Sequence, residues 1–404
     1  MTGPGNPASH KAVVQPAGVI DHVMSWLADQ ALESTELAPL FSGFCERILM
    51  VGIPIDRVAV TWPALHPMIN SERLLWRRGE DIEHRTFGDG EIESEGWQRS
   101  PVRYLLHSDS LIFRRRLVGA RALIDFPLLE DLAGEGYTDY FAMKTFFSIP
   151  RIGNVSTGIM ASWATTRNEG FAEEELAIIA TLQKEFAVAF RSSVQNDVMR
   201  TIGQVYLGPT AAERVLSGQI RRGDGREIDA VIWISDLRNS TQLSESMPLS
   251  DYLSLLDIYF ECVGGAVLSE GGDILDFVGD SVVGIFPIDD DDAPSRASRA
   301  AVLAHQNARE QLERDPDLPL KFGIGITAGT VMHGNFGTPE RLVFSAIGPS
   351  VNEAARIEKL TKTLEVPVLA SAKIAEAAGD IWQSVGEHQL DGVSKPVPLF
   401  SADL

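Results

Sequence analysis

The stretch Gly271–Phe286, which reads GGDILDFVGDSVVGIF, decides the fold of the C-terminal half of this chain. Two apolar, β-favouring segments flank the pair Gly279–Asp280, and Gly271 ends whatever precedes them. Glycine and aspartate suit the backbone of a tight turn, so the pattern predicts a hairpin with Asp280 at its tip. An ordinary polar turn has the same appearance, and this stretch alone indicates no function.

A second stretch, Ala230–Ser235 (AVIWIS), is a continuous apolar run that is typical of a buried strand, and Asp236 ends it. Apolar residues at helical spacing predict a helix between this strand and the hairpin, from about Leu249 to Glu270. A further helix is expected at about Ala293–Arg314 and a strand at about Leu318–Thr327. The resulting order is β-α-β-β-α-β, the split βαβ arrangement.

Asp236 and Asp280 are far apart in the sequence but are expected to converge. A right-handed crossover makes the first two strands parallel, so the end of the first strand and the hairpin turn lie on the same edge of the sheet. Converging carboxylates are the ligands that hard divalent cations such as Mg²⁺ require. The sequence therefore predicts a metal site at this edge.

From about Glu227 to the C-terminus, the chain resembles the catalytic domain of class III adenylate/guanylate cyclases. The resemblance rests on three motifs in the family's order, ISDLRNST, GGDILDFVGD and RLVFSAIGPSVNEAARIE, and covers somewhat less than half of the chain. It implies an α+β domain with a ferredoxin-like βαββαβ fold. It also implies an enzyme that converts ATP or GTP to the 3′,5′-cyclic monophosphate and pyrophosphate, using Mg²⁺ or Mn²⁺ with two ions per site.

The resemblance assigns the metals to Asp236 and Asp280, with the Leu237 carbonyl as a third ligand. It assigns ribose orientation to Asn352 and stabilisation of the charge on the α-phosphate to Arg356. These two residues are four positions apart on the helix predicted for Val351–Lys362, so they share one face. In the family the metal carboxylates and this helix come from different chains. Because this chain carries both sets, the resemblance implies a head-to-tail homodimer.

Nucleotide contacts are expected from the loop after the first strand, whose N–H groups suit phosphate oxygens, and from a few single residues. Adenylate cyclases usually carry Lys where Asp276 stands, and guanylate cyclases carry Glu, so the choice between ATP and GTP stays open. Asp391 stands where Lys is frequent, which makes Lys395 the candidate replacement. The predicted contacts are Asp276, Ser345, Leu237, Arg238, Asn239, Ser240 and Lys395.

Two other functions fit parts of this pattern. A cyclase fold with little turnover could serve as a regulatory or nucleotide-binding module, and the departures at Asp276 and Asp391 favour that reading. A diguanylate cyclase shares the strand order and has a superficially similar GGDIL segment. Here, however, Asp273 begins a strand instead of occupying the hairpin tip, and that family has no place for the helix with Asn352 and Arg356.

In the N-terminal half the pattern predicts a helix from Ile20, helices at Leu40–Val51 and Phe171–Arg191, and strands at Asp56–Trp62, Arg73–Arg77, His84–Phe87, Asp139–Phe147 and Ser156–Thr165. A further helical stretch after Gln195 is expected to break at Leu207, Gly208 and Pro209. From about Thr35 to Ser193 this half resembles a GAF-type domain, most clearly in GFAEEELAIIATLQKEFAVAF. It is either a GAF-like α/β sensor for an unknown small-molecule or protein regulator, or a structural or dimerisation domain. The predicted divisions are a disordered tail at 1–17, this domain at 18–193, a helical linker at 194–226 and the cyclase domain at 227–404. Several aromatic residues are candidates for a ligand pocket or for core: Trp62, Trp76, Tyr137, Phe141 and Trp163.

Composition and charge limit the binding partners and the cellular compartment that are expected. The net charge of −21 on 404 residues argues against general binding to nucleic acids or anionic membranes. Cys45 and Cys262 lack metal-ligand spacing and are expected to be buried free thiols in a reducing compartment. No uninterrupted apolar run reaches the length of a bilayer span, and the N-terminus lacks a signal-peptide core. A cytoplasmic protein is the expectation.

Overall fold

The computed structural model describes residues 17–33, 35–92, 94–147, 158–289, 291–379 and 381–402. The chain divides into two compact units, Met1–Ile202 and Gly203–Leu404, and each combines helices with a sheet. The α+β class expected from the sequence is therefore confirmed. The predicted disordered tail lies outside the described residues except for Ala17, which begins the first helix.

The N-terminal unit is built around a 6-stranded sheet of order β3-β2-β1-β6-β5-β4. Every neighbouring pair in this sheet is antiparallel. The elements are α1 (Ala17–Glu33), α2 (Leu37–Met50), β1 (Arg57–Pro63), β2 (Ser71–Arg77), β3 (Glu83–Phe87), α3 (Asp89–Ile92), α4 (Glu95–Gln98), α5 (Pro101–His107), β4 (Ile112–Arg116), α6 (Pro127–Gly134), β5 (Asp139–Phe146), β6 (Gly158–Thr165) and α7 (Glu173–Leu207).

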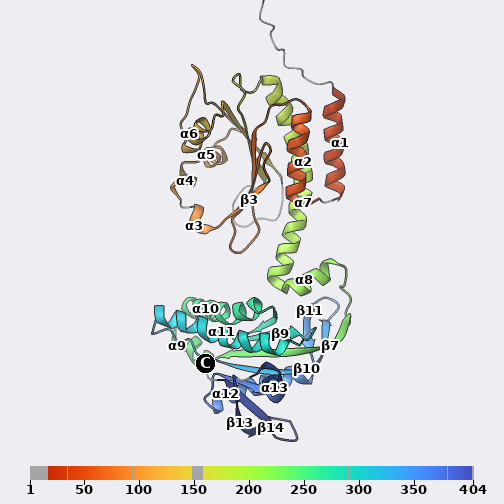
Figure 1. Cartoon of the computed structure of the whole chain (residues 1–404), viewed down its shortest axis with the longest axis vertical. Helices are drawn as coiled ribbons and strands as arrows, with labels where there is room; N and C mark the ends of the chain where they lie inside the picture. The colour runs from red at the N-terminus through yellow and green to blue at the C-terminus, as the bar shows by residue number, and fades with distance from the viewer. Residues whose placement is uncertain are drawn as a thin grey trace, which may run out of the picture. The chain divides into compact units, whose positions relative to one another are not determined.

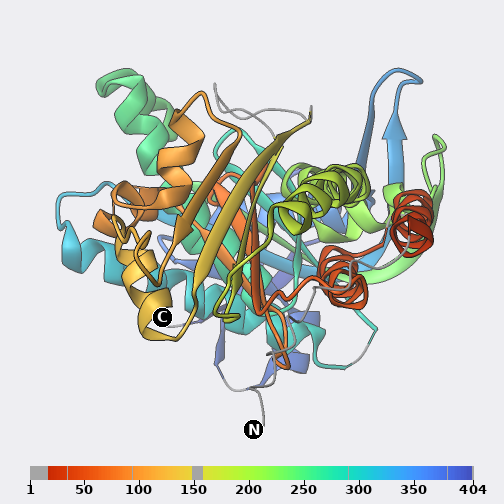
Figure 2. The same cartoon turned by 90° about the horizontal axis from the view of Figure 1, so that it is seen from above.

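Helices cover both faces of this sheet. On one face α1, α2 and α7 bury an aromatic core in which Phe44 stacks on Phe186 and meets the edge of Trp163. On the other face α5 and α6 cover a smaller cluster around Phe113 and Tyr140. Figure 2 shows these two helix groups on opposite sides of the strands.

Most strands predicted for this unit are confirmed, but β4 was missed. Its sequence, IFRRR, carries three successive arginines and has no apolar alternation. The arginines are tolerated because Arg114 binds the buried Asp139 on the neighbouring strand, at 2.7 Å. Part of the strand predicted for Ser156–Thr165 lies outside the described residues, and the described strand begins at Gly158.

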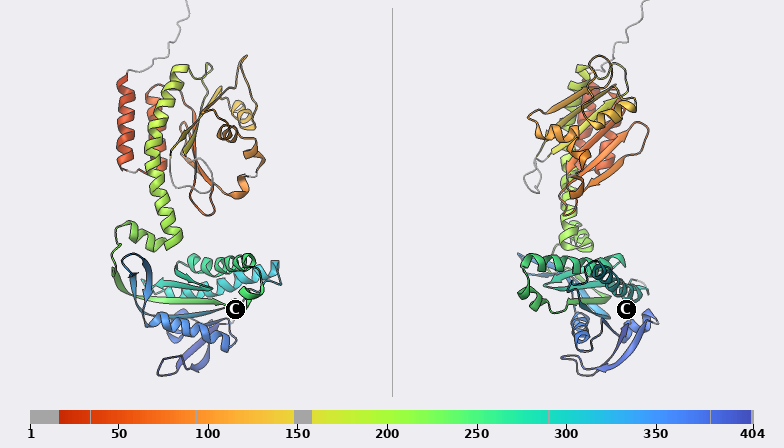
Figure 3. Two further views of the ribbon diagram at one scale, coloured as in Figure 1. Left: turned by 180° about the vertical axis from the view of Figure 1, so that it is seen from behind. Right: turned by 90° about the vertical axis from the view of Figure 1, so that its left-hand side faces the viewer.

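Helix α7 is longer than expected. The helix predicted to end at Arg191 continues without a break to Leu207, through the first part of the predicted linker (Figure 3). The predicted interruption at Gly208 and Pro209 is confirmed, because Gly208 has a φ of 82° and Pro209 begins α8 (Pro209–Leu216). Glycine adopts this left-handed conformation at little cost, and proline suits the first turn of a helix.

The C-terminal unit contains an 8-stranded sheet of order β13-β14-β12-β10-β7-β9-β8, with β11 paired to β10. The predicted βαββαβ order is confirmed by β7, α10, β8, β9, α11 and β10. The elements are β7 (Gly225–Leu237), α9 (Ser240–Ser246), α10 (Leu249–Ser269), β8 (Asp273–Val278), β9 (Ser281–Pro287), α11 (Ala293–Arg314), β10 (Phe322–Gly337), β11 (Leu342–Ile347), α12 (Pro349–Thr363), β12 (Val368–Ser371), α13 (Ala372–Ala378), β13 (Trp382–His388) and β14 (Val397–Ala402).

Opposite faces of this sheet carry different helices. Figure 1 shows α10 and α11 on one face, where they pack on residues such as Val231 and Trp233 of β7. Helix α12 covers the other face and places Ala354 against Ala230 and Ile232. Cys45 and Cys262 are buried and free, as predicted.

Helix α10 bears on the expectation of no membrane span, although its acidic residues Asp251, Asp257 and Glu261 interrupt its apolar sequence. Among the described residues it is long and apolar enough to cross a bilayer by length and composition. Its Tyr259, Val263 and Val267 are fully buried in the core beneath the sheet. A core helix passes the same test, so α10 is weak support for a membrane span.

Strand β10 continues well beyond the predicted Thr327, because glycines within it let other backbone pass closely instead of ending the strand. A Cβ atom on Gly325 would lie 2.6 Å from the Ala354 carbonyl oxygen of α12. This glycine therefore sets how closely α12 approaches the sheet.

Gly325→Ala should weaken the C-terminal unit by about 1–3 kcal/mol, because the added methyl group must push α12 off the sheet. Gly265→Ala is the matched control, since a Cβ on this exposed position of α10 meets nothing within 4 Å. The control should leave stability unchanged or raise it by about 0.5–1 kcal/mol. Denaturant unfolding followed by circular dichroism compares the two variants. Equal midpoints would show that α12 does not depend on this close approach.

Candidate active site

The predicted convergence of Asp236 and Asp280 is confirmed. Strands β7 and β9 are antiparallel, and their register places Asp236 directly opposite Ser281, the residue after Asp280. The Ser281 hydroxyl donates a hydrogen bond to Oδ1 of Asp236. Oδ2 of Asp280 is buried and accepts no hydrogen bond within the described residues. Ser281 was not predicted, although its position next to Asp280 was a usable signal.

The electrostatics of this pair fit a bound cation. The pKa of Asp236 is raised above its ordinary value, chiefly by burial, with a further contribution from the charge of Asp280. Burial also raises the pKa of the nearby Tyr252 hydroxyl, and the two aspartates add to that shift. A divalent cation would remove the repulsion and provide a partner for the orphaned oxygen.

Protein ligands for a metal are few at this site. The described residues contain no group of three or more His, Cys, Asp and Glu side chains that could hold an ion. Asp236 and Asp280, with the Leu237 carbonyl as a candidate, would therefore leave several positions to water and substrate. That is the usual situation for Mg²⁺ in sites that bind nucleotide phosphates.

The loop after β7 is fixed to the rest of the unit through Arg238. Its N–H donates to the Lys321 carbonyl at 2.7 Å, so this N–H is not available to a phosphate. Its guanidinium forms an ion pair with Glu358 at 3.2 Å and hydrogen-bonds to Thr361, both on α12. The side chain of Arg238, which the sequence analysis lists as a nucleotide contact, therefore braces the loop and is bound within the chain.

Glu358 and Thr361 were not singled out from the sequence. Both are buried, and burial raises the pKa of Glu358 from its usual 4.5 to about 7, although the Arg238 charge acts in the opposite direction. Asp236 and Asp280 also contribute to this rise. The signal was the position of Glu358 two residues after Arg356, on the buried side of the same helix.

Asn239 and Ser240, the remaining residues of this loop, have backbone conformations that suit their residue types. Asn239 has a φ of 57°, in the left-handed region that asparagine tolerates better than most residues. Ser240 follows as the first residue of α9.

Asn352 and Arg356 lie together on the outward side of α12, while Ala354 and Ile357 face the sheet. Within the described residues neither Asn352 nor Arg356 makes an ion pair or hydrogen bond. Asn352 is exposed and Arg356 is half-buried. Neither side chain is bound to Asp236 or Asp280 of its own chain by an ion pair or hydrogen bond among the described residues.

The predicted base contacts come from two different strands of the sheet. Asp276 is exposed on the edge strand β8, opposite Val283, just after a bulge at Leu275. Ser345 is half-buried on β11, opposite Gly334 of β10. Some residues of β8 and β11 lie close together, although the two strands are not hydrogen-bonded to each other.

Lys395 lies in the exposed segment between β13 and β14 and has no ion-pair or hydrogen-bond partner among the described residues. Asp391, in the same segment, is 3.8 Å from Lys359 across an exposed surface. Gly392 lies beside the Arg356 guanidinium. This segment therefore adjoins the outward side of α12.

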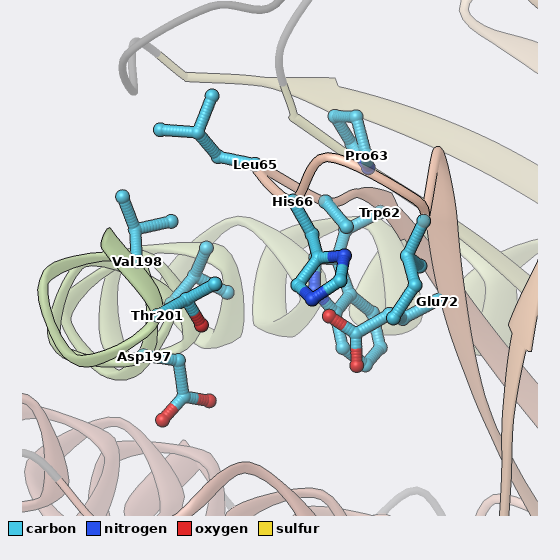
Figure 4. Close-up of a pocket in the computed structure, with 11 residues that line it drawn as sticks. Trp62, Pro63, Leu65, His66, Glu72, Asp197, Val198 and Thr201 are labelled. Carbon is cyan, nitrogen blue, oxygen red and sulfur yellow. The ribbon is translucent and has the colours of Figure 1, made fainter. Parts of the chain in front are cut away.

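The N-terminal unit has its own cavity, with a volume of about 200 Å³ (Figure 4). Burial and the charge of Glu72 raise the pKa of Asp197 on its wall. Of the aromatic residues proposed for a pocket, Trp62 lines this cavity, and the other four are buried in core clusters. The lining includes Trp62, His66, Glu72, Asp197, Val198 and Thr201.

Comparison with known proteins adds the following findings. No family model matches the chain. Uncharacterized proteins of Mycobacterium bovis and Mycobacterium tuberculosis are 34% identical over 218 residues, which is 52% of this chain and 38% of theirs. The chain thus spans well under half the length of these relatives.

Three similar solved structures are cyclases, and each covers less than half of this chain. The guanylyl cyclase Cya2 is 31% identical, with 44% of this chain and 93% of that chain covered and a TM-score of 0.40. The adenylyl cyclase CyaB from P. aeruginosa is 25% identical, with 45% and 96% covered and a TM-score of 0.40. A bacterial light-regulated adenylyl cyclase is 24% identical, with 44% and 91% covered and a TM-score of 0.40.

Proposed function

We propose that this chain is a nucleotide cyclase that converts ATP or GTP to the 3′,5′-cyclic monophosphate and pyrophosphate. The observation that carries the proposal is the convergence of Asp236 with Asp280, one of whose oxygens is buried without a partner among the described residues. The same unit presents Asn352 and Arg356 free on one side of α12. The three sequence motifs that resemble class III cyclases contain all four residues.

In the proposed reaction the ribose 3′-hydroxyl attacks the α-phosphate of its own nucleotide, and pyrophosphate leaves. Mg²⁺ or Mn²⁺ held by Asp236 and Asp280 would supply a lowered pKa for the attacking hydroxyl and positive charge for the phosphates. The Asn352 amide orients the ribose by hydrogen bonding. The Arg356 guanidinium places two donors on the α-phosphate oxygens, where negative charge develops.

We also propose a homodimer. Asn352 and Arg356 form no ion pair or hydrogen bond with Asp236 or Asp280 of their own chain among the described residues, which supports a site shared between two chains. Strand β8 is an edge strand whose Phe277 and Val278 are exposed, so a sheet edge with apolar side chains is open to a second copy. A head-to-tail pair would give two composite sites.

The base preference rests on Asp276. An ionised carboxylate only accepts hydrogen bonds, so it can pair with guanine N1–H and the 2-amino group but not with adenine N1. Ser345 can donate or accept and does not discriminate. The hydrogen-bonding argument favours GTP. Asp is nevertheless one methylene shorter than Glu, and a bridging water would allow the adenine amino group to pair with Asp276.

A second candidate is a regulatory or nucleotide-binding module with little turnover, and Asp391 favours it. Asp391 stands where a triphosphate-contacting Lys is frequent, and it faces Lys359 instead. The diguanylate cyclase alternative is less favoured, because Asp273 is the first residue of β8 and the turn falls at Gly279 and Asp280.

The N-terminal unit is proposed to regulate this activity. Helix α7 closes the aromatic core of that unit and continues without a break to Leu207. Its Asp197, Val198 and Thr201 line the cavity of Figure 4. A ligand in this cavity would contact the helix directly, which gives regulation a physical route.

Asp280→Asn should lower cyclic nucleotide formation by at least about 100-fold, because it removes a metal ligand at nearly constant volume. Asp291→Asn, an exposed position just before α11, is the control and should retain activity. Purified protein is incubated with ATP or GTP and Mg²⁺ or Mn²⁺, and products are separated by chromatography. Turnover by the wild type and its loss in Asp280→Asn support the proposal; equal turnover in both would refute the metal assignment.

Mixing inactive Asp280→Ala and Arg356→Ala chains should restore activity. Half of the dimers are then mixed, and each mixed dimer has one whole site, so recovery of about a quarter of wild-type activity is expected. Subunit exchange is verified by mass spectrometry of the mixture. No recovery after verified exchange would mean that each site is built within one chain.

Asp276→Lys should move the ATP/GTP ratio of kcat/KM toward ATP by about 5- to 150-fold, the effect of a buried mismatched hydrogen-bond pair. Asp257→Lys makes the same charge change on the exposed side of α10 and should leave the ratio unchanged. An unchanged ratio in Asp276→Lys would show that Asp276 does not face the base.

A further inference from the structure

The C-terminal unit contains a cavity of about 300 Å³ that is separate from the proposed active site. This volume is at the lower end of the range of small-molecule sites. Arg226, near the start of β7, lines the cavity, whereas Asp236 lies near the end of the same strand. About 30 Å of extended backbone separates these two residues. The lining includes Arg214, Gln219, Asp224, Arg226, Asn335 and Phe344.

Strand register brings several of these side chains to one face of the sheet. Arg226 of β7 is directly opposite His333 of β10. Asn335, two residues farther along β10, is opposite Phe344 of β11. Residues opposite each other, and residues two apart on one strand, point to the same face. Arg214 reaches this face from α8, with its guanidinium 5.2 Å from the centre of the Phe344 ring. Helix α8 and three adjacent strands therefore build the cavity.

Arg214 and Arg226 are two cations without a counter-ion. Within the described residues neither forms an ion pair or a hydrogen bond. Burial lowers the pKa of Arg214, and the charge of Arg226 lowers it further, so the two guanidinium groups repel each other. The contact of Arg214 with the Phe344 ring leaves its N–H donors unused. Both arginines thus have donors and positive charge to offer at the cavity.

The neighbouring carboxylates do not pair with these arginines. Asp224 lines the cavity, but its Oδ2 accepts a hydrogen bond from the Arg221 N–H at 3.1 Å and it forms no ion pair with Arg214 or Arg226. Glu213 acts on Arg214 only as a nearby charge. One negative and two positive side chains therefore line the cavity, which leaves it positively charged.

His333, next to the cavity, does not compensate this charge. It is 3% exposed, and the edge of its ring meets Phe344 at 4.6 Å between ring centres. Burial lowers the pKa of His333 to about 4; the charges of Arg214 and Arg226 act in the same direction, and that of Asp273 acts against them. The imidazole is therefore neutral at physiological pH and supplies no negative charge.

A phosphate or carboxylate group would meet these requirements. Its oxygens would accept the paired N–H donors of the guanidinium groups, and its charge would offset the repulsion between them. The Gln219 side chain is exposed at the cavity, and its amide is a further donor. The Phe344 ring supplies an apolar wall for the remainder of the ligand.

We propose that Arg214 and Arg226 bind the oxyanion of a small phosphorylated or carboxylated ligand in this cavity. The ligand would join α8 to β7 and β11. Phe344 faces the cavity, and the next residue, Ser345, points to the opposite face of β11. Since Ser345 is the candidate base contact, a bound ligand has a route to the active site through this strand. That last consequence alone rests on the proposed cyclase function.

The test uses the full-length chain in EDTA without nucleotide. The probes are sodium phosphate and sodium succinate, compared with sodium chloride at matched ionic strength. Hydrogen–deuterium exchange is measured on peptides of α8, β11 and α12. In the wild type at least one probe, at about ten times its Kd, should slow exchange in α8 and β11 about tenfold. A response to phosphate alone identifies a phosphate ligand, a response to succinate alone identifies a carboxylate, and a response to both identifies a general oxyanion site.

Arg214→Gln and Arg226→Gln should each weaken this response, and the double variant should lose it, because the paired donors and the positive charge are removed. Arg341→Gln is the matched control: it removes an exposed arginine between β10 and β11, outside the cavity lining, and should respond like the wild type. Unfolding midpoints in chloride should be unchanged or higher in the two cavity variants, since a repulsion is removed.

Three results would overturn the proposal. Neither probe might slow exchange in the wild type, or the slowing might be confined to α12, which would place the anion at Arg356. Slowing of equal size in the double variant and the wild type would identify a general effect of the salt on the folded chain.

Discussion

The close approach of Asp236 and Asp280 is the constraint on which the proposed site of the C-terminal unit depends. The two carboxylates lie where strand β7 ends and strand β9 begins, and Oδ2 of Asp280 is buried without a hydrogen-bond donor among the described residues. Without a bound cation, two carboxylates so close together destabilise the folded state. They stay together only because the surrounding structure fixes both side chains. Strand β7 is buried from Ala230 to Trp233 between α10 and α12, so its end cannot shift. The repulsion is therefore useful where a cation is to be bound, and it is the physical basis of the proposed chemistry.

Arg238 links this pair to the second half of the proposed site. It follows the first metal ligand by two residues, and its guanidinium holds Glu358 and Thr361 on the buried side of α12. Asn352 and Arg356 lie on the opposite side of the same helix. In the proposed homodimer, each α12 would complete the site of the other chain. The ion pair would then connect the metal loop of one site with the phosphate-binding helix of the other, so the two sites would share one rigid element.

The sequence predicted the C-terminal fold correctly where the local hydrophobic pattern and the rules of strand topology give the same answer. The apolar run before Asp236, the Gly279–Asp280 turn and the helix period between them were sufficient to predict the order of elements and the meeting of the carboxylates. Long-range contacts were not predictable in this way. Strand β10 extends past its glycines because other backbone packs against them, β4 forms because Asp139 binds its arginines, and Glu358 is buried because Arg238 reaches it. Each depends on a partner that is distant in sequence, which propensity and periodicity do not encode.

The N-terminal unit shows how this fold accommodates buried charges. Asp139 is fully buried, and Arg114 donates to it at 2.7 Å and the Phe171 N–H at 3.0 Å. Lys144, also buried, donates to the Leu105 and Ser108 carbonyls. Buried charges of this kind persist because the fold supplies their hydrogen-bond partners. Those partners lie far away in the sequence, so a charged residue such as Asp139 or Lys144 could not be recognised as buried before the fold was known.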